Sequence, residues 1–199
     1  MESKVIKIGG HPYDESLLSS NPYLIDAGAF RGQFCLPFLK RHGGKALCLE
    51  PNIAQFPVTW RDLNIVVKQA ALTAMDHKDD IEFNVYTDRL DCSSIFPRSD
   101  RGNIKKLKIP SVTLREICNI PVDLVKLNIE GEEWELLCQA KHEDLANVSQ
   151  IAAEFHYGNL TPENMKIEDV IANLKSLGFE VDVKTTGPDH AELQAWRVK

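Results

Sequence analysis

The residues with the clearest chemical potential are Asp26, Gly28 and Gly32, which form the spacing Asp-x-Gly-x-x-x-Gly after an apolar run at 23–25. That run has Asn-Pro before it and glycines after it, which predicts a short buried strand that turns into a helix. In such a turn the glycines let the backbone approach a ligand closely, and the N–H groups of the following helix face negative charge. The spacing therefore predicts a nucleotide-type site at the end of this strand.

The middle of the turn indicates which nucleotide binds. A dinucleotide fingerprint has the form G-x-G-x-x-G, and its second glycine makes room for the pyrophosphate. Phe30 stands where that glycine would be, so the sequence disfavours a pyrophosphate site and a nicotinamide oxidoreductase. The observed spacing suits S-adenosylmethionine, which carries an amino acid and a sulfonium in place of phosphates.

A second candidate ligand-binding acid is Glu50, which ends the apolar run 45–49 and so lies at the tip of the next predicted strand. An acid in that place can accept hydrogen bonds from both hydroxyls of a ribose. Both acids also have structural interpretations, because Asp26 could cap the helix that follows it and Glu50 could be a surface acid. Their order on one strand–helix–strand unit favours the cofactor interpretation.

Further polar residues follow the apolar runs 122–129 and 148–155, which predict two more strands. Glu130, Glu154 and His156 stand at or just after their ends, the edge where ligands of an open α/β sheet bind. Methyl transfer to oxygen needs a base for the hydroxyl proton and alignment of the two reacting centres. His156 is the first candidate for that base, because its unperturbed pKa lies near neutrality. Glu130 and Glu154 could orient the acceptor or hold the histidine in one tautomer.

These catalytic candidates have structural alternatives of similar weight. His156 could be a hydrogen-bonded histidine at a strand end, and Glu130 could be an acid in the first turn of a helix, where it favours the dipole. Of the other five histidines, His11 is expected in a loop, and no role is assigned to the rest.

The remaining pattern predicts one α/β domain over 1–199, with a mostly parallel sheet, helices on both faces and an antiparallel final strand. Residues 1–22 are expected to form a lead-in or a lid, and 76–112 a β-rich insertion with a loop of several hydroxyls. The strand after Glu50 is expected at 64–72. Helices are predicted at 33–42, 53–62 and 161–177.

The composition of the chain limits the classes of binding partner and the cellular compartment that we expect. A net charge of −6 argues against nucleic acid, whose backbone requires clustered Lys and Arg. There is no run near the ~18 apolar residues of a membrane helix, and the N-terminus lacks a signal-peptide pattern. The five cysteines are dispersed without a C-x-x-C pair. They predict a reducing, cytoplasmic compartment and disfavour zinc, so no metal site is expected.

Three motifs occur in order along the chain: Tyr-Leu-Ile-Asp-Ala-Gly-Ala-Phe-Arg-Gly-Gln-Phe at 23–34, Leu-Glu-Pro-Asn at 49–52 and Val-Asp-Leu-Val-Lys-Leu-Asn-Ile-Glu-Gly-Glu-Glu-Trp at 122–134. With them the chain resembles the FkbM-type methyltransferases. The resemblance implies a Rossmann-like class I methyltransferase fold and S-adenosylmethionine as cofactor. It further implies that Asn52, in the second of these motifs, and Ala71, beside the adenine, contact the cofactor. It also implies O-methylation of a sugar or natural-product hydroxyl, on a small-molecule or glycan acceptor.

One position departs from the pattern of the family. The usual Lys-x-Asp-x-Glu-Gly is Lys-Leu-Asn128-Ile-Glu-Gly in this chain. Asparagine cannot act as a carboxylate base or bring negative charge to a cation. The alternative function is therefore a catalytically inactive, methyltransferase-like binding module that keeps the cofactor site. The sequence leaves the oligomeric state open.

Overall fold

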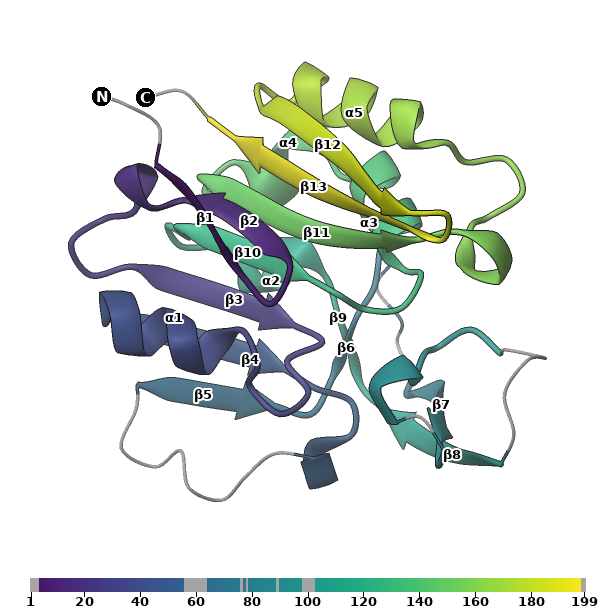
Figure 1. Ribbon diagram of the computed structural model, residues 1–199. Coiled ribbons are helices and arrows are strands. Elements are labelled where there is room, and N and C mark those ends of the chain that lie inside the picture. Colours follow the sequence, from purple (N-terminus) through teal and green to yellow (C-terminus); the bar gives the residue numbers. More distant parts are fainter. Residues whose placement is uncertain are drawn as a thin grey trace.

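A seven-stranded sheet lies at the centre of the protein, with the strand order β12-β13-β11-β10-β3-β4-β5 (Figure 1). The structure, a computed structural model, describes residues 4–55, 64–75, 77, 79–88, 90–97 and 103–197. The seven strands are β3 (Tyr23–Ala27), β4 (Lys45–Leu49), β5 (Ile65–Lys68), β10 (Leu124–Leu127), β11 (Gln150–His156), β12 (Glu180–Gly187) and β13 (His190–Trp196). Neighbours from β11 to β5 pair in parallel, whereas β13 is antiparallel to both β11 and β12. The sheet is therefore mainly parallel and ends in an antiparallel pair, as the sequence predicts.

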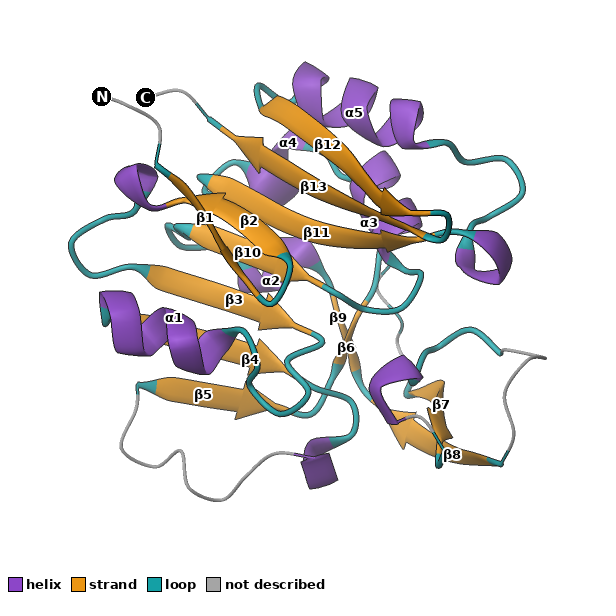
Figure 2. Ribbon diagram, in the orientation of Figure 1, coloured by secondary structure: helices purple, strands orange, loops and turns teal. Residues whose placement is uncertain are grey.

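Helices and a hairpin cover the two faces of the sheet (Figure 2). One face packs against α1 (Cys35–His42) and the N-terminal hairpin, the other against α3 (Glu133–Gln139) and α5 (Ile167–Ser176). The short helices α2 (Leu114–Ile117) and α4 (His142–Leu145) join the α3 side. Because both faces are covered, β10 is buried along its whole length, which explains its nearly continuous apolar run. None of the helices in the described part of the chain is long and apolar enough to cross a membrane.

The third predicted strand and the second predicted helix differ from expectation. The run 64–72 forms two strands, β5 in the central sheet and β6 (Ala71–Leu72), which pairs in parallel with β9 (Ser111–Val112). The chain leaves the central sheet between them, because the N–H of Ala71 bonds to the carbonyl of Pro110 instead. Of the predicted helix 53–62, Ile53–Gln55 form a short 3₁₀ helix and 56–62 lie outside the described residues.

Helix starts also shift relative to the prediction. Pro37 falls within the first turn of α1, where its missing N–H breaks no helical bond. The last helix begins at Ile167, so the start predicted at Pro162 is wrong. The carboxylate of Asp169 accepts a hydrogen bond from the N–H of Lys166 at 2.9 Å and so satisfies a donor at the true start.

The N-terminal hairpin consists of β1 (Val5–Ile8) and β2 (His11–Asp14) and packs on β11 and β13 (Figure 1). The side-chain amide of Gln150 fastens it, accepting from the N–H of Asp14 at 2.9 Å and donating to its carbonyl at 3.1 Å. The N-terminal hairpin is thus part of the packed structure, and the prediction of a loop at His11 is wrong, because His11 lies in β2.

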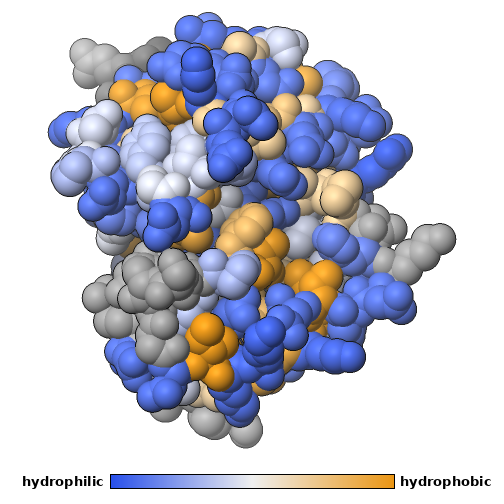
Figure 3. Space-filling view, turned by 90° about the vertical axis from the view of Figure 1, so that its right-hand side faces the viewer, coloured by the Kyte–Doolittle hydropathy of each residue, from blue (hydrophilic) through white to orange (hydrophobic). Residues whose placement is uncertain are grey.

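An insertion between β6 and β9 lies beside the sheet. Its antiparallel strands β7 (Ile81–Tyr86) and β8 (Ile104–Ile109) lie near the carboxyl ends of the central strands (Figure 1). A small apolar cluster that includes Phe83 and Ile109 holds the insertion together. Figure 3 views the molecule from this edge and shows apolar residues gathered among mostly hydrophilic ones.

Candidate active site

The glycine turn after β3 holds the tips of three strands together. The N–H groups of Gly28 and Ala29 both donate to the carbonyl of Leu49, at 3.0 and 3.1 Å. Gly28 has a φ of +71°, and a Cβ at this position would lie 1.8 Å from the carbonyl oxygen of Asn128. Only glycine allows this approach, so the residue is required where β3, β4 and β10 end.

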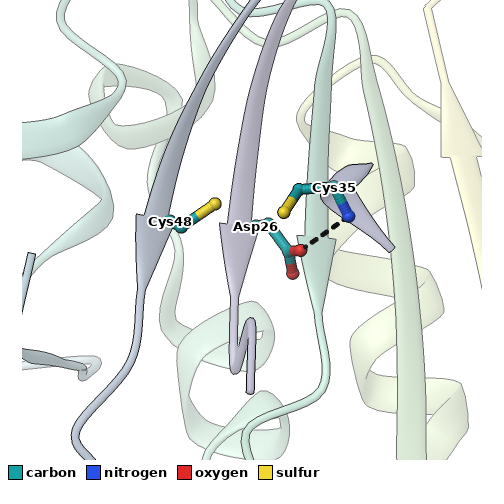
Figure 4. Close-up of side chains that lie close together, drawn as sticks. All are labelled: Asp26, Cys35 and Cys48. Atoms are coloured by element: carbon teal, nitrogen blue, oxygen red, sulfur yellow. Dashed lines mark hydrogen bonds between the residues drawn. The ribbon is translucent and has the colours of Figure 1, made fainter. Parts of the chain in front are cut away.

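Asp26 stabilises the glycine turn through its contacts with Cys35 and Lys126. It is fully buried, its Oδ2 accepts from the N–H of Cys35 at 3.1 Å, and its Oδ1 lies 3.0 Å from Nζ of Lys126. Figure 4 shows Asp26 close to Cys35 and Cys48, with the hydrogen bond from the N–H of Cys35 to its carboxylate. Lys126 also donates to the carbonyls of Ala27 and Gly28, at 3.2 and 2.9 Å. The geometry matches the helix-capping alternative, because the carboxylate accepts from an N–H at the start of α1.

Lys126 is a structural residue that the sequence analysis did not assign. Its side chain is 4 % exposed within β10, and a buried lysine requires a paired acid. The signal in the sequence was a single lysine in an otherwise apolar strand, with Asp26 on the strand that pairs with it. The pair fixes the turn by joining β10 to both β3 and the start of α1.

A pocket opens at the carboxyl ends of the strands and encloses about 560 Å³ of empty space, part of it open to solvent. The glycine turn and the ends of β4 and β10 form one wall, and the insertion forms the other. The lining residues are Gly28, Phe30, Leu49, Glu50, Pro51, Ala70, Ala71, Leu72, Phe83, Leu90, Ser93, Ile95, Asn128, Ile129, Glu130 and Glu132. Of the predicted cofactor residues, Gly28, Glu50 and Ala71 thus face the pocket.

Two backbone N–H groups position the carboxylate of Glu50 within this pocket. Its Oε2 accepts from the N–H of Phe30 and its Oε1 from the N–H of Asn52, both at 2.8 Å. Burial raises the pKa of Glu50 above its usual range, and the two N–H groups oppose that shift. Each carboxylate oxygen keeps a further lone pair, so the group can accept from two ribose hydroxyls. Asn52 makes its described contacts through its backbone, since its N–H donates to Glu50 and its carbonyl accepts from the N–H of Gln55 at 3.0 Å. Gly32 donates to the carbonyl of Ala29 at 2.7 Å within the turn.

The predicted catalytic residues gather at the ends of β10 and β11. Oε1 of Glu130 lies 3.4 Å from Nε2 of His156, and Glu130 is the one of the three that lines the pocket. Oε2 of Glu154 accepts from Nδ2 of Asn128 at 2.9 Å. The structure therefore brings Glu130 and His156 into contact and places Glu154 beside Asn128.

Two histidines without a predicted role join this cluster. His11 of β2 is buried, with Nε2 3.9 Å from Oε2 of Glu154, and the ring of His190 lies 4.9 Å from that of His156. His190 is the direct cross-strand partner of His156. No local sequence pattern marks His11, because its position depends on how the hairpin packs on the sheet.

The insertion fastens the turn that carries Glu130. The hydroxyl of Ser94 donates to the carbonyl of Glu130 at 2.7 Å, and Oε1 of Glu132 accepts from the N–H of Ala74 at 2.9 Å. Glu130 itself has a φ of +56°, an unusual conformation for a residue other than glycine. Burial raises the pKa of Glu132 to about 7. These contacts tie the serine-containing loop to the edge of the pocket.

A family model described as the methyltransferase FkbM domain matches residues 26–181. The N-terminal domain of EvdMO1, solved with SAH bound, is 14% identical with a TM-score of 0.53 over 92% of this chain and 77% of that one. Precorrin-6y C5,15-methyltransferase from Geobacter metallireducens GS-15 is 11% identical with a TM-score of 0.50 over 90% of this chain and 83% of that one. No curated protein sequence matches the chain.

At these identities the two structures show the fold alone, an α/β methyltransferase fold with a mainly parallel sheet. The family match covers most of the chain and includes the glycine turn, Glu50 and the three residues Glu130, Glu154 and His156. The cofactor of such methyltransferases is S-adenosylmethionine, as the turn spacing predicts. The chain belongs to the FkbM methyltransferase domain family.

Proposed function

We propose that the chain transfers the methyl group of S-adenosylmethionine to a hydroxyl of a sugar or natural product, in a small molecule or a glycan. The observation that carries the proposal is the position of Glu130, which lines the pocket and also contacts His156. Glu50 in this pocket can bind the ribose of the cofactor, and the Glu130–His156 pair at its edge can accept a proton.

The residues of the pocket fit the cofactor. Glu50 would accept from the ribose hydroxyls, Ala71 would border the adenine, and Gly28 leaves room above the turn. When bound, S-adenosylmethionine supplies an electrophilic methyl group on a sulfonium. Phe83 and Ile95 of the insertion line the opposite wall, where they exclude water from the reacting groups.

The chain's own contribution to the reaction is to take the proton of the acceptor hydroxyl. His156 is the proposed base, and Glu130 lies between it and the pocket, where its carboxylate can orient the hydroxyl and hold the imidazole. As the acceptor oxygen gains a methyl group it loses its proton, and this proton passes to the His156–Glu130 pair. The carboxylate stabilises the imidazolium that results.

Asn128 bears on the choice between an enzyme and an inactive binding module. Its Nδ2 donates to Glu154, which an aspartate at this position could not do. The carboxylate of Glu154, on the neighbouring strand, therefore lies beside Asn128. The asparagine in place of the family's usual aspartate leaves the Glu130–His156 pair intact. This contact supports the enzyme over the binding module.

The experiment that tests the proposal measures release of S-adenosylhomocysteine from S-adenosylmethionine across a panel of sugar and polyketide alcohols. An acceptor-dependent turnover is expected with at least one class of alcohol. Cofactor binding without turnover across a broad panel would favour the binding module.

A further inference from the structure

A second pocket lies on the other side of the glycine turn, under the N-terminal hairpin. It shares Gly28, Phe30 and Asn128 with the first pocket, so the two are lobes of one site. Its other lining residues are Gly9, His11, Ala29, Gln33, Phe34 and Lys126. We propose that this lobe holds the amino-acid end of the cofactor and that His11 accepts a hydrogen bond from its ammonium group. The inference rests on the proposed function, and His11 lies outside the matched family domain at 26–181.

Two buried polar atoms in this lobe lack a partner. Nδ1 of His11 and Oδ1 of Asn128 are shut off from water and have no hydrogen-bond partner among the described residues. His11 as a whole is 4 % exposed. Buried polar atoms without partners cost free energy and are rare, so each calls for an explanation. A donor group that enters the lobe would supply the missing partner.

Both atoms are hydrogen-bond acceptors. Nε2 of His11 faces Oε2 of Glu154 at 3.9 Å, which favours the proton on Nε2 and leaves a lone pair on Nδ1. Nδ2 of Asn128 donates to the same carboxylate, which leaves its Oδ1 as an acceptor. Two neutral acceptors beside a carboxylate match an ammonium group and disfavour a phosphate.

The charges around the lobe agree with this assignment. Burial, assisted by the charges of Lys126 and His156, lowers the pKa of His11 to about 3, so the imidazole is neutral near pH 7. The ammonium of Lys126 lies 3.0 Å from Asp26, which compensates its charge. The carboxylate of Glu154 has neutral groups, His11 and Asn128, as its described partners.

The hairpin holds His11 in place before any ligand binds. Gln150 bonds to both the N–H and the carbonyl of Asp14, and the ring of Phe34 packs edge-on against His11 at 5.7 Å. A residue that is already positioned loses little entropy on binding. His11 therefore acts as a fixed acceptor for the cofactor.

The test compares two ligands by calorimetry: S-adenosylhomocysteine, and 5′-methylthioadenosine, which lacks the amino-acid end. His11→Ala should weaken S-adenosylhomocysteine binding about tenfold to a hundredfold, the range for a hydrogen bond to a charged group. Affinity for 5′-methylthioadenosine should stay unchanged. Tyr13→Phe is the matched control on the same strand, since it removes only the hydroxyl that contacts His42, and it should change neither affinity.

Two further variants keep the test decisive if His11→Ala does not fold. The amide of asparagine reaches the position of Nδ1, whereas that of glutamine reaches the position of Nε2. His11→Asn should therefore retain most of the affinity for S-adenosylhomocysteine, and His11→Gln should lose it. Equal affinities of these two variants would overturn the inference.

The outcomes separate this inference from the proposed function. Equal losses for both ligands in folded His11→Ala, or an unchanged affinity for S-adenosylhomocysteine, would overturn the inference and leave the proposed function standing. A native protein that binds neither ligand would overturn both.

Discussion

Glu130 and His156 meet across the ends of the neighbouring strands β10 and β11, with Oε1 and Nε2 3.4 Å apart. Glu130 lines the pocket at the strand ends, and His156 is held in place because its carbonyl accepts from Nε1 of the buried Trp134 at 3.1 Å. An acid–histidine pair in this place connects the fold of the sheet directly to the proposed proton transfer.

The first prediction follows from that pair. His156→Ala should lower the rate of methyl transfer about 10²–10⁴-fold, the usual loss for a general base. Cofactor affinity should stay nearly intact, because the residues proposed to bind the cofactor, Glu50 and Gly28, line the pocket, whereas His156 does not. The measurement is release of S-adenosylhomocysteine with a reactive alcohol, next to calorimetric binding. Equal turnover in the two proteins would remove His156 from the mechanism and direct attention to Glu130 or Glu154.

A second prediction concerns Gly28. Gly28→Ala should lower the free energy of unfolding by at least about 3 kcal/mol, since it adds a clash with the carbonyl of Asn128 to the strain of a positive φ. Gly9→Ala is the matched control: its φ of +53° is also positive, but a Cβ there meets no atom within 4 Å. Its cost should be near 1 kcal/mol. Similar losses in a denaturant titration of the two variants would contradict the close approach.

A third prediction concerns the pH dependence of stability. Burial raises the pKa of Glu132 to about 7 from its ordinary value of 4.5, so the folded state holds this proton more tightly than the unfolded state. Its contribution is fully present below pH 4.5 and is lost as pH rises through about 7. The fall in Tm between pH 5 and pH 8 should therefore be smaller in Glu132→Gln, which can still accept from the N–H of Ala74. Identical pH profiles would show that Glu132 is not protonated in the fold.

A fourth prediction concerns metal ions. Glu154, His156 and His190 offer ligand atoms within 4.8 Å of one another, a group that could hold a cation. The sequence predicts no metal site, and the proposed base requires a free imidazole. EDTA should therefore leave methyl transfer unchanged. If EDTA abolished turnover and Mn²⁺ restored it in the native protein but not in His190→Ala, His156 would be a ligand and not the base.

Local sequence patterns predicted the features that are encoded within a few residues. The strand, turn and helix around Gly28, and the acid at the tip of the next strand, follow from short apolar runs and the glycines that end them. The contact between Glu130 and His156 also follows in part, because parallel strands bring their carboxyl ends to one edge.

Long-range packing accounts for the residues that the sequence did not place. His11 reaches the cluster through a hairpin fastened by contacts such as that of Asp14 with Gln150, which are 136 positions apart in the chain. Asp26 was assigned to the cofactor, because its pairing with the buried Lys126 depends on strand order. No local pattern predicts the packing of the hairpin, and the single lysine in an apolar strand marks Lys126 without identifying Asp26 as its partner.

The most direct test of the cofactor site is calorimetric titration of the native protein and of Glu50→Ala with S-adenosylhomocysteine and with NAD. The native protein should bind S-adenosylhomocysteine and show no comparable NAD binding. Removal of a charged hydrogen-bond acceptor should weaken the complex by roughly 1.5–3 kcal/mol, about tenfold to a hundredfold in affinity, in folded Glu50→Ala. Tight NAD binding without an S-adenosylhomocysteine signal, or an unchanged affinity in Glu50→Ala, would contradict a methyl-donor site built on the glycine turn and Glu50.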